Sequence, residues 1–149
     1  MNFSNPANSY RQSAIAGATP IGLVIALYDK LAVDLRLAVE AMNNNDIESR
    51  CTALNHATLV LGQLQDWVNL ESGDPLARSL ADFYQIIRAR MLEASLKKST
   101  ELLEAQIELV LQVRSAWQQR DGTAATAEAI QIHMIVSENE STLSQSLHA

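Results

Sequence analysis

The sequence predicts an all-α protein, an antiparallel up-down four-helix bundle, and three observations support this fold. The chain of 149 residues is 48% hydrophobic with only 5 Gly and 3 Pro, a composition that suits a helical domain with a sizeable core. Hydrophobic residues recur at spacings of three and four in four segments of roughly 20 residues, which is the period of one helix face. The turns between these segments are short, so successive helices must run antiparallel.

The first predicted helix, from Thr19 to Met42, is the element around which we expect the others to pack. Thr19 can cap its first turn, and Pro20 suits the first helical position, where a missing N–H costs nothing. Further hydrophobic side chains lie beyond one face, so we expect cover on several sides. The charges of Asp29 and Asp34 argue against a membrane span. The predicted core face holds Ile21, Val24, Tyr28, Leu31, Leu35, Ala38 and Met42.

The second predicted helix follows a turn of polar residues, with Asp46 as its N-cap, and runs from Ile47 to about Leu70. Gly62 lies inside this helix, where glycine costs roughly 1 kcal/mol relative to alanine. We interpret it as a close helix crossing or as a point of close approach by a bound peptide. The predicted core face holds Ile47, Leu54, Ala57, Leu61, Leu64 and Val68.

The third and fourth helices are predicted from their caps and from two further periodic faces. Asp74 and Pro75 follow a Ser-Gly turn and suit the N-cap and first position of the third helix. Ser99 can cap the fourth helix, which we expect to end near Gly122. The two predicted faces hold Leu76, Leu80, Phe83, Ile87, Met91 and Ala94, and then Leu103, Ile107, Val110, Val113 and Trp117.

These helices place a single domain over residues 19–121, after a polar N-terminal segment (1–18) and before an acidic C-terminal tail (122–149). The tail is expected to be solvated or to form a short fifth helix. It contains a hydrophobic cluster, for which we consider two interpretations. The cluster either covers an apolar groove of this chain or a second copy, or it packs permanently on the bundle. Its residues are Ile130, Ile132, Met134, Ile135 and Val136.

Charge and cysteine content exclude several classes of function. The formal net charge is −6, and residues 121–149 hold four acidic residues and no Lys or Arg. This balance disfavours nucleic acid and anionic membrane surfaces, both of which require clustered cations. The single Cys51 and the polar N-terminal segment, which lacks the apolar stretch of a secretory signal, predict a cytoplasmic protein without stable membrane insertion.

No enzyme or cofactor site is predicted. The histidines lack metal-ligand spacing, and Asp29 and Asp34 lie about 140° apart around a helix, so we interpret them as solvated charges. His56 raises the alternative of a histidine phosphotransfer domain. That pattern places Lys and Gly three and four residues after the histidine, where this chain has Leu59 and Val60. An ordinary exposed or hydrogen-bonded histidine fits better.

Hydrophobic residues are more numerous than one narrow core requires, notably Trp67 and Trp117 near helix ends. Such a surplus indicates grooves that bind amphipathic segments of a partner. The residues alone therefore predict a binding module, with an unrelated helical adaptor or dimerisation module as the alternative.

An ordered set of short motifs resembles the flagellin-specific secretion chaperones of the FliS family over about residues 8–120. The chain departs from that family at His56, where the family has Arg, and at Lys30, where it often has Gly. The matching motifs are Tyr10-Arg11-Gln12, Thr19-Pro20, Leu27-Tyr28-Asp29, Ser72-Gly73, Phe83-Tyr84, Arg90–Ala94 and Arg114-Ser115-Ala116-Trp117.

The resemblance implies a non-catalytic cytoplasmic chaperone that binds the disordered C-terminal segment of flagellin. Binding would prevent premature polymerisation and deliver flagellin to the flagellar export gate, a second partner. The implied contacts are Tyr10, Ile15, Leu27 and Tyr28, although Leu27 and Tyr28 also suit the core. Whether the free chain forms a homodimer is left open.

Overall fold

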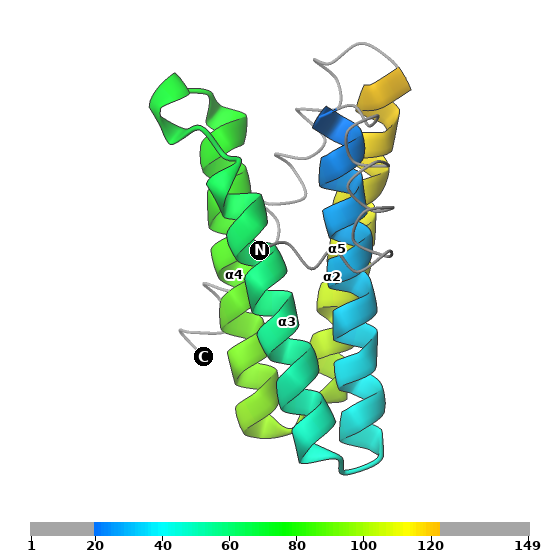
Figure 1. Cartoon of the computed structure of the whole chain (residues 1–149). Coiled ribbons are helices and arrows are strands. Elements are labelled where there is room, and N and C mark those ends of the chain that lie inside the picture. The colour runs from blue at the N-terminus through cyan, green and yellow to red at the C-terminus, as the bar shows by residue number, and fades with distance from the viewer. Residues whose placement is uncertain (1–19, 123–149) are drawn as a thin grey trace, which may run out of the picture.

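The computed structural model describes residues 20–122, which form four long α-helices and one short 3₁₀-helix, with no strand among them. This confirms the predicted all-α fold. Successive long helices run antiparallel (Figure 1). The elements are α2 (Pro20–Asn43), α3 (Ile47–Asp66), η1 (Leu70–Ser72), α4 (Pro75–Lys97) and α5 (Thr100–Gly122).

The four long helices form two pairs that spread apart at one end. α2 packs mainly against α3 and α5, while α4 also packs against α3 and α5, so α2 and α4 lie diagonally across the bundle. The α3–α4 pair and the α2–α5 pair meet near the α2–α3 turn and diverge toward the end that carries η1 (Figure 1). We call these the turn end and the open end.

Local side chains begin the helices where the sequence predicts. Asp46 accepts a hydrogen bond from the Ser49 backbone N–H at 3.1 Å, and Asp74 accepts one from Leu76 N–H at 3.0 Å. These carboxylates satisfy donors that the first turn of a helix leaves unpaired. The Ser99 hydroxyl serves α5 in the same way, because it accepts from the Leu102 N–H at 3.2 Å.

Two predictions about α3 are wrong. The helix ends at Asp66 rather than near Leu70, because the Asn69 side chain accepts the Glu71 N–H and starts the separate turn η1. Gly62 does not lie at a close helix crossing, since a Cβ there would meet no heavy atom within 4 Å. Approach by a bound peptide therefore stays as the prediction for this glycine.

The core runs along the bundle axis, and most of the predicted faces contribute to it. Ile47 is an exception, because it occupies the exposed first position of α3. The cover predicted around α2 is also incomplete within residues 20–122, where Val33 and Leu37 are each 50% exposed. The largest fully buried side chains are Tyr28, Leu31, Leu35, Leu61, Leu64, Phe83, Tyr84, Ile87, Leu103, Val110 and Val113.

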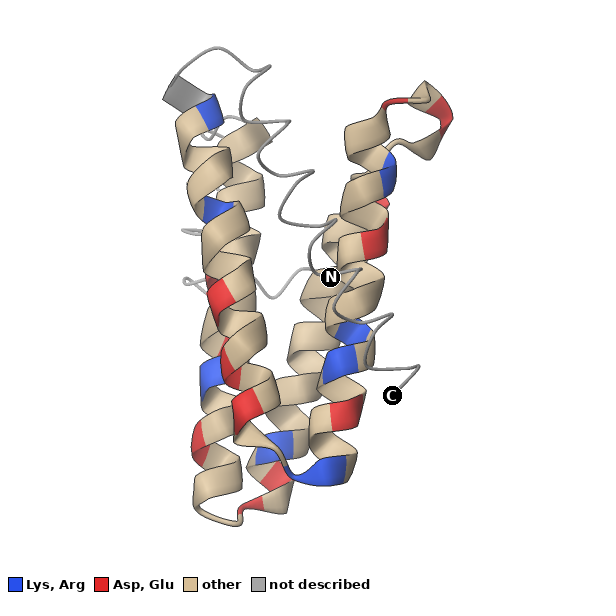
Figure 2. Cartoon of the chain, turned by 180° about the vertical axis from the view of Figure 1, so that it is seen from behind, with Lys and Arg blue, Asp and Glu red and all other residues tan. Residues whose placement is uncertain are grey.

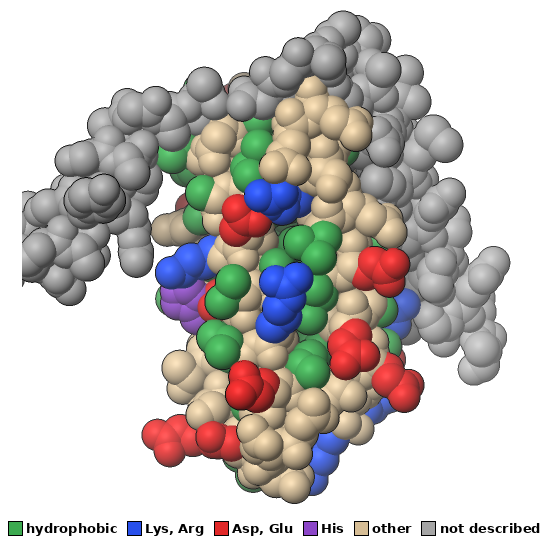
Figure 3. All heavy atoms as spheres, turned by 90° about the vertical axis from the view of Figure 1, so that its right-hand side faces the viewer, with side chains coloured by type: hydrophobic (Ala, Val, Ile, Leu, Met, Phe, Trp, Pro, Cys, Tyr) green, Lys and Arg blue, Asp and Glu red, His purple; other side chains and the backbone are tan. Residues whose placement is uncertain are grey.

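The surface mixes hydrophobic and charged side chains. Lys, Arg, Asp and Glu lie on every long helix (Figure 2), and hydrophobic side chains reach the surface in patches on the face formed by α2 and α5 (Figure 3). Within the described range, no helix combines the length and the apolar character that crossing a membrane requires.

Candidate functional site

The open end of the bundle contains an apolar pocket of about 200 Å³, which we call the end pocket. All four long helices contribute to it because the two helix pairs diverge there. Asp74 is the only charged side chain among its lining residues, and that carboxylate caps α4. The pocket is lined by Val24, Leu64, Trp67, Val68, Asn69, Ser72, Asp74, Leu76, Ala77, Leu80, Tyr84 and Trp117.

Two tyrosines link diagonal helices beneath the end pocket. The hydroxyl oxygens of Tyr28 on α2 and Tyr84 on α4 are 2.9 Å apart and share a hydrogen bond. Their rings meet edge to face, with centroids 6.3 Å apart. Burial raises the pKa of Tyr28 to about 12, and it also raises the pKa of Tyr84 well above the ordinary value, with the neighbouring Tyr28 adding to this rise. Both hydroxyls therefore remain neutral at physiological pH.

The two tryptophans occupy different positions around the end pocket. Trp117 is buried, and its indole N–H lies beside the Tyr28 hydroxyl without a well-formed hydrogen bond to any described residue. The Arg120 guanidinium lies 5.5 Å from the centre of the Trp117 ring. Trp67 is 52% exposed at the rim. Trp67 is therefore the aromatic side chain that the end pocket exposes to solvent.

Three of the motifs that carry the family resemblance meet at this site. Tyr28 bonds to Tyr84, which belongs to the Phe-Tyr pair of α4. Asp29 follows Tyr28 in the sequence. Its carboxylate accepts a hydrogen bond from the Arg114 guanidinium of α5, and the two side chains form an ion pair. Arg114 opens the motif that Trp117 closes. Segments far apart in the chain are thus connected by contacts among α2, α4 and α5, of which the Tyr28–Tyr84 pair lies beneath the end pocket.

The structure separates the four predicted contact residues. Tyr10 and Ile15 lie outside the described residues, as do the Thr19 cap and the hydrophobic cluster of the tail. Leu27 is partly buried against the core, and Tyr28 is completely buried. Direct contact by Leu27 or Tyr28 with a partner stays a prediction; Tyr28 is hydrogen-bonded to Tyr84, which does line the end pocket.

Sequence reasoning missed the position of the end pocket. Several of its lining residues, such as Leu64 and Leu80, read as ordinary core positions because they continue the helical period. They are buried, and only the divergence of the helix pairs places them beside a hollow. The sequence did mark some lining residues, namely Trp67 and Trp117 as large aromatics near helix ends and Tyr84 through its motif, but not their meeting at one hollow.

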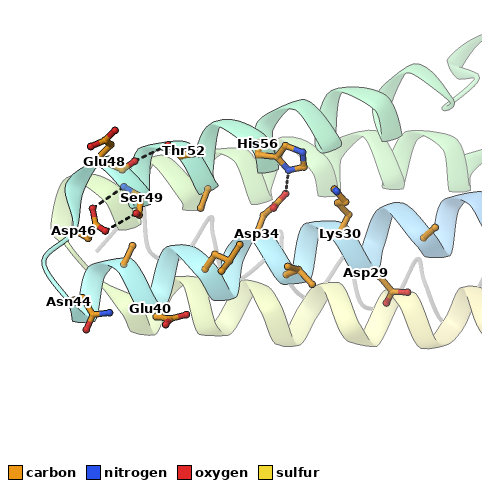
Figure 4. Close-up of a pocket in the computed structure, with 15 residues that line it drawn as sticks. Asp29, Lys30, Asp34, Glu40, Asn44, Asp46, Glu48, Ser49, Thr52 and His56 are labelled. Carbon is orange, nitrogen blue, oxygen red and sulfur yellow. Dashed lines mark hydrogen bonds and ion pairs between the residues drawn. The ribbon is translucent and has the colours of Figure 1, made fainter. Parts of the chain in front are cut away.

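His56 does form a hydrogen bond, as the sequence favoured, but its partner was unexpected. Its Nδ1 atom lies 2.5 Å from Oδ2 of Asp34 on α2 (Figure 4). The Asp34 side chain is only 8% exposed, so the interpretation of Asp34 as a solvated charge is wrong. The pair links α2 to α3. Within residues 20–122, no group of three or more His, Cys, Asp or Glu residues is placed to hold a metal ion.

The fold and the end pocket define a helical-bundle protein with an apolar hollow at its open end. The family profile described as "Flagellar protein FliS" matches residues 3–124. The chain therefore belongs to the FliS family.

Relatives with the name flagellar secretion chaperone support this assignment. FliS of Bacillus subtilis is 29% identical over 119 residues, which cover 80% of this chain and 88% of the relative. FliSB of Pseudomonas aeruginosa is 28% identical over 106 residues, covering 71% and 84%. FliS of Salmonella typhimurium is 25% identical over 119 residues, covering 79% and 88%.

Proposed function

We propose that this chain is a cytoplasmic flagellar secretion chaperone that binds the disordered C-terminal segment of flagellin. Binding masks a segment that packs as helix in the filament, so free flagellin does not polymerise prematurely and stays competent for export. The flagellar export gate is the second proposed partner, to which the complex delivers flagellin. The proposal assigns the chain no catalytic step and no cofactor.

The observation that carries this proposal is the end pocket, an apolar opening in a chain of the FliS family. Hydrophobic surface that remains open after folding is typical of protein-binding sites. The lining residues come from four helices, which suits an occupant that passes over more than one helix. A disordered segment loses conformational entropy when it binds, so its affinity is modest for the area buried. Modest affinity favours release at the export gate.

Tyr10, Ile15 and Leu27 remain the proposed contacts with flagellin. Tyr28 is the fourth proposed contact; in the described conformation it is buried and hydrogen-bonded to Tyr84, which lines the end pocket. Family membership favours this function over an unrelated adaptor. It also favours it over histidine phosphotransfer, whose pattern the chain lacks at Leu59 and Val60.

Co-purification with flagellin tests the proposal. The full chain should retain full-length flagellin and should lose flagellin that lacks its C-terminal segment. Flagellin shortened by an equal length at its N-terminus is the matched control and should still bind. Undiminished binding of the C-terminally shortened flagellin would falsify the proposal. Added ATP should leave retention unchanged, and hydrolysis of ATP by the purified chain would contradict the non-catalytic assignment.

A further inference from the structure

A second and larger hollow lies between α2 and α3, and we call it the side groove. Its volume is about 990 Å³, and it shares no lining residue with the end pocket. It runs along α2 from Ala26 to Asn44, roughly 27 Å at 1.5 Å per helical residue. Figure 4 shows its polar lining residues on both helices and around the α2–α3 turn.

The apolar part of the side groove centres on Val33 and Leu37. They lie four residues apart, so they form neighbouring positions on one face of α2. Each is 50% exposed, so half of each side chain is left uncovered in the structure described. Ala26, Ala41 and Ala53 also line the hollow, and their small side chains leave room for a partner's side chains. Such a surface matches an apolar pair at the same spacing on a partner helix.

The charged part of the side groove is predominantly acidic. Asp29 is paired with the Arg114 guanidinium, and Asp34 is hydrogen-bonded to His56, so neither carboxylate is unpartnered. The remaining carboxylates gather toward the α2–α3 turn (Figure 4). The basic side chains in the lining are those of Lys30 and His56, and both lie away from that turn (Figure 4). The five carboxylates of the lining are those of Asp29, Asp34, Glu40, Asp46 and Glu48.

The carboxylates at the turn are placed to meet a cation. Glu40 projects from the end of α2, and Asp46 and Glu48 lie at the start of α3 (Figure 4). Hydrogen bonds from Ser49 lower the pKa of Asp46, so this carboxylate stays ionised well below neutral pH. None of the three has a Lys or Arg neighbour among the residues that line the hollow. Their charge therefore remains available to a ligand.

We propose that the side groove binds a basic amphipathic helical segment of a protein other than flagellin. Its apolar side chains would cover Val33 and Leu37, and its Lys or Arg side chains would lie against the carboxylates at the turn. The acidic C-terminal tail of this chain is a poor occupant, because residues 121–149 contain no Lys or Arg. A symmetric contact with a second copy would oppose identical acidic surfaces. A chaperone built this way holds its cargo and a second protein at separate surfaces.

Two synthetic peptides of about 18 residues, long enough to span the groove as helix, test this proposal. Both carry the same leucine face, and their polar faces carry either Lys and Arg or Glu at the same positions. We expect the full chain to bind the cationic peptide at least about 10-fold more tightly in fluorescence anisotropy. Added salt should reduce this difference, because part of the affinity is electrostatic. Equal affinity for both peptides would overturn the proposal.

A pair of matched variants locates the binding. Val33→Ser with Leu37→Ser should weaken the cationic peptide by about 10-fold or more. Leu92→Ser with Leu96→Ser is the control, since these residues have the same spacing on α4, are 63% and 77% exposed, and line neither hollow. The control should bind the peptide as the parent chain does. Equal losses in both double variants would show non-specific adhesion and would overturn the proposal.

Competition experiments test whether flagellin, another segment of this chain or a second copy of it occupies the side groove instead. The cationic peptide and flagellin should bind together, and the Val33/Leu37 variant should retain flagellin. Displacement of the peptide by flagellin would place the groove in the flagellin site and overturn the inference, while the proposed chaperone function would stand. Tighter peptide binding by a chain without residues 1–18, or peptide-induced dissociation of a dimer in sedimentation, would identify this chain itself as the occupant and also overturn it.

Discussion

The end pocket and the side groove share helix α2 but differ in almost every physical property. The end pocket is small and apolar, and it lies over buried aromatic side chains. The side groove is about five times larger in volume, at 990 Å³ against 200 Å³, and it carries carboxylates along its length. One helix therefore presents two chemically distinct surfaces, one at the open end and one toward the turn end.

This difference shows how a small bundle can separate two kinds of recognition. Apolar burial supplies affinity for many hydrophobic segments, with little discrimination among them. Charge complementarity instead selects partners and depends on salt. In this chain the aromatic cluster is tied together by Tyr28, Tyr84 and Trp117, whereas Asp34 and His56 tie α2 to α3 beside the groove. Each surface is held by its own interhelical contacts.

The largest effect is expected at the rim of the end pocket. Trp67→Ala should weaken binding of the flagellin C-terminal segment by about 30-fold or more, since exposed aromatic anchors commonly contribute 2 kcal/mol or more. The melting temperature should change little, because Trp67 is already 52% exposed. Titration calorimetry and thermal unfolding measure the two effects. Leu96→Ala, at a more exposed residue outside both hollows, is the control, and equal losses of affinity would remove the end pocket from the binding site.

The next effect separates core from contact within the predicted flagellin site. Leu27 packs against the core, so Leu27→Ala should lower the free energy of unfolding by roughly 2 kcal/mol. This value is the lower end of the range for buried leucines, because Leu27 is only partly buried. Tyr10→Ala should instead lower flagellin affinity and leave the melting temperature unchanged. Urea unfolding and titration calorimetry distinguish the two. The reverse pattern would show that core and contact residues are assigned the wrong way round.

The sequence predicted the local features of the fold better than the features that depend on how the helices pack. Helix starts depend on neighbouring residues, so Asp46, Asp74 and Ser99 were identifiable as caps. The burial of Asp34 was not, because it depends on His56 of another helix. Tyr28 was marked through its motif, yet the end pocket above it was not predictable. Its shape arises from the spreading of helix pairs, which no local period encodes.

Alkaline pH should weaken the cluster beneath the end pocket but not the side groove. The pKa of Tyr28 is about 12 in the folded chain and near 10 when unfolded. Between these values the folded chain binds more protons, so the free energy of unfolding falls as pH rises. The stability is fully present below pH 10 and falls by as much as about 1.4 kcal/mol per pH unit for one tyrosine.

Urea unfolding from about pH 9 to about pH 11 measures this slope. Tyr28→Phe should lower stability by about 1 kcal/mol at neutral pH, because the Tyr84 hydroxyl loses its partner. The same variant should show a shallower decline above pH 10, since one of the two buried hydroxyls no longer ionises on unfolding. A decline as steep as that of the parent chain would mean that Tyr28 is not responsible.

The smallest effect concerns the tail, whose hydrophobic cluster lies outside the described residues. Charge distinguishes the surfaces it could cover, since residues 121–149 carry four acidic residues and no Lys or Arg. The side groove would repel such a segment, whereas the end pocket has only Asp74 and lies at the end of the bundle where α5 finishes. If the tail covers the end pocket in half of the molecules, a chain ending at Arg120 should bind flagellin about twice as tightly.

The truncated chain should also self-associate more readily, because its end pocket is never covered. Its affinity for the cationic peptide should stay unchanged, since the side groove would not have held the tail. Calorimetry with both ligands and sedimentation give these three quantities on one preparation. A lower melting temperature together with weaker flagellin binding would instead assign the tail to the bundle as a permanently packed fifth helix. In that case the open end would be a smaller surface in the full chain than residues 20–122 present.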